Sequence, residues 1–84
     1  MRIDKFLKNA RIIKRRSVSK EACDQGRVLI NGQVAKAGME VKVGDEITIQ
    51  FGNNPLTVEV LVIKETVRKE EAEDLYRVKG DHDA

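Results

Sequence analysis

The sequence predicts an α+β domain in which two short helices precede a small, mostly antiparallel sheet. In the first 25 residues, apolar side chains recur with helical spacing. From residue 28 to about residue 63 they alternate with polar residues or form short runs between Gly and Asn turns, which is typical of strands. The length of 84 residues suits one domain, because domains run from about 50 to 250 residues.

The first helix is predicted over residues 3–10. Its buried face comprises four apolar residues at positions i, i+3, i+4 and i+7, namely Ile3, Phe6, Leu7 and Ala10. Asp4 lies in the first turn, where a carboxylate interacts favourably with the positive end of the helix dipole. This carboxylate can also brace a neighbouring arginine.

A second helix is predicted to end near Gln25, with Gly26 in the left-handed position that follows a helix. Ser17 is the favoured N-cap, because its hydroxyl can accept a hydrogen bond from an early backbone N–H, and Ser19 is the competing choice. A small apolar face toward the first helix is expected from Val18 and Ala22.

A hairpin is predicted directly after the second helix. Residues 28–30 form its first strand, and residues 34–35 continue on the return. Asn31-Gly32 between them is the strongest two-residue hairpin signal, because both central positions of a type I′ turn need a positive φ.

The second half of the chain is predicted to complete the sheet. Strands 46–51 and 56–62 are expected to pair antiparallel around a turn at residues 52–55, and a short acidic helix follows over residues 69–75. Tyr76 and Val78 form a last extended piece, and the residues from Gly80 onward are expected to be frayed.

Cations are concentrated between the two helices. Residues 11–20 contain five Lys or Arg and no acid. Residues 1–36 carry ten Lys or Arg against three Asp or Glu, whereas residues 37–84 carry six against eleven. This asymmetry predicts a polyanionic partner that is contacted on one side. Arginine suits phosphate, because its planar fork donates two parallel hydrogen bonds.

The side chains predicted to bind nucleic acid are Arg2, Lys5, Arg11, Lys14, Arg15, Arg16, Ser17, Lys20, Arg27 and Lys36. Arg2 and Lys5 extend the surface from the first helix, and Arg27 and Lys36 are rim contacts. Asp4 is predicted to orient a neighbouring arginine rather than to contact phosphate. The alternative is that these cations are ordinary residues of solvated helix surfaces.

Catalysis finds no support in the sequence. His82 is the only histidine, and no Ser/His/Asp or Cys/His arrangement can be built around it. The acids at positions 70–74 are expected to form a solvated helix face, because consecutive acids do not share one face. We therefore expect no enzymatic activity, no cofactor and no metal.

Cys23 is the only cysteine, which excludes an intrachain disulfide and favours a small buried hydrophobic side chain. The sequence lacks a long apolar run, so we expect no membrane partner and a cytoplasmic protein.

Five segments, in this order, resemble the S4 RNA-binding domain family: Arg2-Ile3-Asp4-Lys5-Phe6-Leu7, Arg15-Arg16-Ser17, Ala22, Gly26-Arg27-Val28-Leu29-Ile30-Asn31-Gly32 and Val43-Gly44-Asp45-Glu46-Ile47. The resemblance covers about residues 1–51. It implies the S4-type (alpha-L) fold, with two packed N-terminal helices on a small bent, mostly antiparallel sheet and a short C-terminal helix. It also implies structured RNA as the ligand, with Arg2, Asp4, Lys5, Arg15 and Arg16 as the central group.

We predict a single S4-like RNA-binding domain over residues 1–84, with a core at about 1–65 and an acidic C-terminal helix and tail at about 66–84. The whole chain is similar to small stand-alone bacterial members that act in ribosome-associated quality control. This similarity implies binding to a stalled large ribosomal subunit that carries peptidyl-tRNA, with contacts to large-subunit rRNA and tRNA. It also implies assistance to RqcH in adding C-terminal alanine tails, by a protein that is monomeric when free.

Two alternatives remain open. The first is a heat-shock-type ribosome recycling or assembly factor, although the heat-shock relative carries a basic C-terminal extension and this chain ends acidic and short. The second is a helix-turn-helix DNA-binding protein. Such proteins read bases with their second helix, whereas the cations here crowd the connector.

Overall fold

The structure is a computed structural model that describes residues 1–79. Its helices are α1 (Ile3–Asn9), α2 (Arg16–Asp24) and the 3-10 helix η1 (Lys69–Leu75). Its strands are β1 (Val28–Ile30), β2 (Gln33–Val34), β3 (Glu46–Phe51), β4 (Asn54–Val60) and β5 (Tyr76–Lys79). The predicted frayed tail, with His82, lies outside the described residues.

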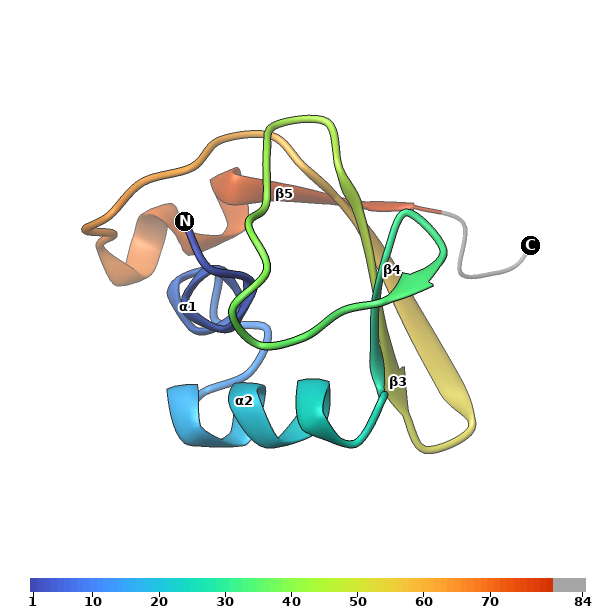
Figure 1. The fold of residues 1–84 in the computed structure, drawn as a ribbon. Coiled ribbons are helices and arrows are strands. Elements are labelled where there is room, and N and C mark those ends of the chain that lie inside the picture. Colours follow the sequence, from blue (N-terminus) through green and yellow to red (C-terminus); the bar gives the residue numbers. More distant parts are fainter. Residues whose placement is uncertain (80–84) are drawn as a thin grey trace.

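The five strands form one antiparallel sheet in the order β2-β1-β3-β4-β5. Ile47 of β3 lies opposite Ile30 of β1 on one side and Val58 of β4 on the other. All three side chains are buried, and α1 and α2 lie on the same side of the strands in Figure 1. The predicted α+β fold class is therefore confirmed.

The core lies between α1 and the sheet. The predicted inner face of α1 is confirmed, because its four apolar side chains are all buried: Ile3, Phe6, Leu7 and Ala10. They join a cluster with the inward residues of β1, β3 and β4. Leu75 at the end of η1 belongs to the same cluster, so the apolar interior extends past residue 65.

The start of α2 differs from the prediction. The helix begins at Arg16, and its N-cap is Arg15, with extended backbone and no side-chain capping hydrogen bond. Ser17 therefore lies within the first turn, and its assignment as N-cap is wrong. Ser19, the alternative N-cap, is fully buried inside the helix.

The inner face of α2 is also rotated from the one predicted. Val18 is 45% exposed, whereas Ser19 and Cys23 are buried and Ala22 is half-buried. Successive helix residues point about 100° apart. Because Ser19 faces inward, its neighbour Val18 points away from α1.

Two turns explain the remaining strand boundaries. Asn31 and Gly32 have φ of 50° and 85°, which confirms the hairpin turn between β1 and β2. The turn between β3 and β4 is shorter than predicted, because Phe51 already pairs with Asn54. The strand predicted to reach residue 62 ends at Val60. The backbone N–H groups of residues 61 and 62 donate to the Leu75 carbonyl instead, which directs the chain toward η1.

None of the helices in residues 1–79 has the length and apolarity that a membrane span needs.

Candidate nucleic-acid interface

The end of α1 forms a Schellman motif around Arg11. The Ile12 N–H donates to the Leu7 carbonyl over 3.1 Å, and the Arg11 N–H donates to the Lys8 carbonyl over 3.0 Å. Arg11 has a φ of 59°, in the left-handed region where glycine is the usual residue. A residue with a Cβ costs about 1–2 kcal/mol there. The chain turns sharply at Arg11, so the residue with the strained backbone is also one that presents a cationic side chain.

A buried residue fixes the connector that joins α1 to α2. Ile13 is 7% exposed, and its N–H donates to the Leu7 carbonyl over 3.2 Å. Lys14 and Arg15 follow it directly and are exposed. The connector cations are therefore attached to the core through their neighbour, which limits the positions their backbone can take.

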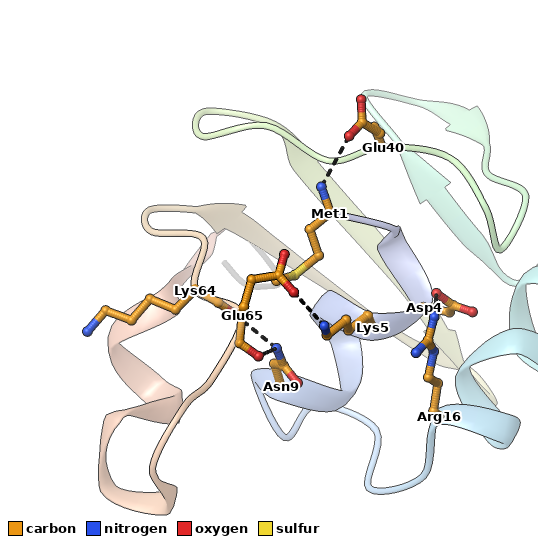
Figure 2. Close-up of polar contacts among 8 residues, drawn as sticks. All are labelled: Met1, Asp4, Lys5, Asn9, Arg16, Glu40, Lys64 and Glu65. Atoms are coloured by element: carbon orange, nitrogen blue, oxygen red, sulfur yellow. Dashed lines mark hydrogen bonds and ion pairs between the residues drawn. The ribbon is translucent and has the colours of Figure 1, made fainter.

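Asp4 brings Arg2 and Arg16 together. Its carboxylate is only 2% exposed, and its Oδ2 accepts a hydrogen bond from Arg2 Nη2 over 3.3 Å. Arg16 Nη2 lies 3.6 Å from Asp4 Oδ1, an ion pair longer than a hydrogen bond, and Figure 2 shows the two side chains beside each other. The side chains of Arg2 and Arg16 remain 50% and 48% exposed. One carboxylate thus holds two guanidiniums that keep free donors and a net positive charge.

The negative charge of Asp4 also acts on the interface between α1 and α2. Burial raises the pKa of the Cys23 thiol to about 11, and the charges of Asp4 and Asp24 contribute to the rise. The thiol is therefore neutral near pH 7. This finding confirms the prediction that Cys23 is a small buried side chain.

A second group of cations lines a cavity of about 210 Å³ at the end of α1. Lys8, Arg11 and Lys14 contribute side chains to it, together with Asn9 and Val67. Within residues 1–79, none of these three cations forms an ion pair. The prediction from sequence omitted Lys8, although its position three residues from both Lys5 and Arg11 would have indicated it.

Lys5 points to another side of α1. Its ammonium pairs with Glu65, while Figure 2 shows Arg16 and Asp4 on the opposite side of the helix. The hydrogen bond from Lys5, together with its charge, lowers the pKa of the Glu65 carboxyl. The Asn9 amide donates to the backbone carbonyls of Lys64 and Glu65 over 3.1 and 3.3 Å. The structure therefore places Lys5 in a contact that fastens the 61–68 segment to α1.

The other predicted site residues are exposed. Arg15, Arg27 and Lys36 have no ion-pair partner in the described part of the chain. Lys20 and Ser17 line a shallow depression on α2 beside the acids Glu21 and Asp24. Residues 1–79 contain no cluster of three or more His, Cys, Asp or Glu side chains suited to a metal ion.

Two short helices on an antiparallel sheet, with cations held at the connector between the helices, are the features of a small nucleic-acid-binding domain. The chain belongs to the S4 domain family, whose model matches residues 1–47. The resemblance inferred from the sequence segments is thereby confirmed.

The particular relatives carry a more specific name. The chain is 62% identical over 79 residues to the RQC P-site tRNA stabilizing factor of Halalkalibacterium halodurans, covering 94% of this chain and 90% of that protein. It is 54% identical over 78 residues to the factor of the same name from Bacillus subtilis, covering 93% and 91%. The predicted whole-chain similarity to the small bacterial members that act in ribosome-associated quality control is confirmed.

A solved structure supports the fold. Heat shock protein 15 of Vibrio cholerae, described as trimeric, superposes with a TM-score of 0.87 at 36% sequence identity. The match covers 94% of this chain and 81% of that one. The predicted S4-type fold is confirmed by this match together with the S4 domain model.

Proposed function

We propose that this protein binds RNA in ribosome-associated quality control. It binds a stalled large ribosomal subunit that carries peptidyl-tRNA and contacts both large-subunit rRNA and the P-site tRNA. There it assists RqcH in adding C-terminal alanine tails to the nascent chain. It acts in the cytoplasm as a binding protein without enzymatic activity, and it is monomeric when free. The name of its relatives at 62% and 54% identity supports the tRNA and quality-control parts of this proposal.

The pairing of Arg2 and Arg16 through Asp4 is the observation that carries the proposal. A guanidinium whose direction is fixed before binding loses less side-chain entropy when it meets a phosphate. The connector cations add further donors that have no acid partner within residues 1–79. Six or seven phosphate contacts predict a log–log salt dependence of affinity with a slope of about −4 to −6.

Arg16→Ala tests the proposal. Because Arg16 is half-exposed, the variant should still unfold cooperatively, whereas its co-sedimentation with large subunits that carry peptidyl-tRNA should be lost. Lys42→Ala is the matched control, since Lys42 is an exposed cation that lines neither the cavity nor the depression described above and makes no ion pair within residues 1–79. If binding survives in the Arg2→Ala, Arg16→Ala double variant, this surface is not the RNA contact.

A heat-shock-type recycling or assembly factor is the second candidate, and the TM-score of 0.87 to heat shock protein 15 favours it. Sedimentation of cell extracts distinguishes the two functions. A quality-control factor is enriched on free large subunits that bear tRNA, whereas an assembly factor is enriched on immature particles.

The exposed surface of α2 argues against reading of DNA bases. Two acids, Glu21 and Asp24, lie in the same shallow depression as Lys20. Their carboxylates would repel the phosphates that flank the major groove of DNA. A folded RNA should therefore outcompete duplex DNA of equal length at matched salt, and equal binding would refute this preference.

A further inference from the structure

A cavity that the proposed function does not use opens where the end of α1 faces η1. It has a volume of about 450 Å³ and is lined by Ala10, Arg11, Lys69, Glu70, Ala72, Glu73 and Tyr76. Pockets for small molecules typically occupy about 300–1,000 Å³. The cavity is thus large enough for a small organic group.

The lining suits a flat group with a polar edge. Ala10 and Ala72 are almost fully buried and supply apolar surface, and the half-buried Tyr76 supplies an aromatic ring. Glu70 and Glu73 are exposed carboxylates, which only accept hydrogen bonds. Burial and the charge of Glu73 raise the pKa of Tyr76, so its hydroxyl stays a donor. An aromatic ring beside hydrogen-bond acceptors matches a nucleobase that carries an amino group.

Arg11 connects this cavity to the cationic one, because its side chain lines both. In the larger cavity the carboxylates of Glu70 and Glu73 offset the cations Arg11 and Lys69, so a phosphate gains no net attraction there. Lys8, Arg11 and Lys14 favour one in the smaller cavity, whose lining includes no acid. Arg11, with its strained φ of 59°, places a guanidinium at the point that the two cavities share.

We propose that the two cavities together bind one unpaired nucleotide of RNA. Its base lies against Tyr76 in the larger cavity, and its phosphate lies between Lys8, Arg11 and Lys14 in the smaller one. An aromatic protein side chain would use the larger cavity alone and leave the three cations without a partner. The proposal rests on the proposed RNA-binding function and assigns it a specific subsite. Because Glu70 and Glu73 accept hydrogen bonds, adenine is preferred to uracil, which has no exocyclic amino group.

The test is a titration of the full ¹⁵N-labelled chain with AMP, UMP and ribose 5-phosphate, followed by NMR. AMP should shift the amide signals of Lys8 and Lys14 and also those of Ala72 and Tyr76. Ribose 5-phosphate should shift only the first pair. UMP should bind about tenfold more weakly than AMP, which corresponds to about 1.4 kcal/mol and to one hydrogen bond to a charged group.

Variants separate the two halves of the subsite. Arg11→Gly fits the left-handed backbone and should weaken AMP and ribose 5-phosphate alike, by about tenfold. Tyr76→Leu should weaken AMP alone, by about tenfold. Glu73→Gln keeps the size of an exposed side chain and should reduce the preference for AMP over UMP. Lys42→Gln is the control and should change nothing.

Three results would overturn the proposal: AMP and ribose 5-phosphate giving the same shifts, AMP giving none, or Arg11→Gly binding AMP as well as the wild type. Failure of the proposed function has a different signature. In that case the chain would not sediment with large subunits that carry peptidyl-tRNA, although AMP would still shift the Tyr76 signal.

Discussion

Asp4→Asn separates the orientation of the two guanidiniums from their charge. The substitution keeps the size of the side chain but removes the negative charge that Arg2 and Arg16 share at 3.3 and 3.6 Å. Without it, two like charges face each other across a neutral amide. Asp4 would then no longer fix the direction in which either guanidinium points.

The cost to stability follows from the burial of the three side chains. Breaking a buried ion pair costs about 3–5 kcal/mol when the remaining charge stays buried, and an exposed pair is worth about 0–1 kcal/mol. Asp4 is 2% exposed, but its partners are about half-exposed and water can solvate them. We therefore expect a loss of about 1–2 kcal/mol, intermediate between these limits. In a domain of this size such a loss lowers Tm by roughly 5–15 °C.

The effect on RNA binding has an informative sign. Asp4→Asn raises the net charge by one, so general electrostatic attraction alone predicts tighter binding. Loss of orientation predicts weaker binding, by about tenfold if one bidentate phosphate contact is lost. Asp24→Asn is the matched control, because Asp24 is exposed on α2 and has no ion-pair partner within residues 1–79. It makes the same charge change without touching the guanidiniums.

Thermal unfolding by circular dichroism and filter binding to large-subunit rRNA at several salt concentrations measure both effects. We expect Asp24→Asn to bind as tightly as the wild type or more tightly. An Asp4→Asn variant that binds as well as Asp24→Asn, with an unchanged Tm, would show that the carboxylate does not orient these arginines.

Three further predictions concern other parts of the chain. Gly32→Ala should cost about 1–2 kcal/mol in urea unfolding through backbone strain alone, because φ is 85° and no atom lies within 4 Å of the added Cβ; an unchanged midpoint would contradict the turn. The Cys23 pKa of about 11 lies above the ordinary thiol value of 9.0. The contribution of the neutral thiol to the stability of the fold is therefore complete below pH 9 and is lost as the pH rises through 11. The stability difference between wild type and Cys23→Ala should therefore shift by about 2 kcal/mol against the wild type between these pH values, and parallel profiles would argue against burial of the thiol. In Lys5→Gln, the lowered pKa of Glu65 should rise toward 4.5 in an NMR titration, because the variant removes the charge of Lys5 that lowers it. In the wild type the ion pair stabilises the fold at neutral pH, and this stabilisation is lost as acid protonates Glu65. An unmoved pKa would exclude the contact.

Local signals in the sequence were sufficient for much of the fold. The spacing of Ile3, Phe6 and Leu7 predicted α1 within one residue of its observed end at Asn9, because a buried helix face leaves a periodic pattern. Asn31-Gly32 predicted the first hairpin, because the turn chemistry is contained in these two residues.

The remaining features depend on tertiary contacts. Ser17 has a good N-cap side chain, yet the position of Ile13 in the core and the turn at Arg11 set where α2 begins. The prediction placed Val18 on the wrong face of α2. The sequence of this nine-residue helix does not show which of its sides packs against α1. The partner of Lys5 lies 60 residues away, and no local pattern indicates such a pair. The spacing of Lys8 from Arg11 is a local signal that the prediction from sequence did not use, and the fold shows its role by placing it beside Lys14.

The attachment of the connector through Ile13 has a consequence for behaviour on warming. Only the buried Ile13 and the half-buried Ile12 attach the loop that carries Lys14 and Arg15 to the core, whereas many contacts hold the sheet. Local opening of this attachment requires less free energy than global unfolding. The upper temperature limit of RNA binding would then be reached before the sheet melts, and amide hydrogen exchange at Lys14 and Arg15 would report it.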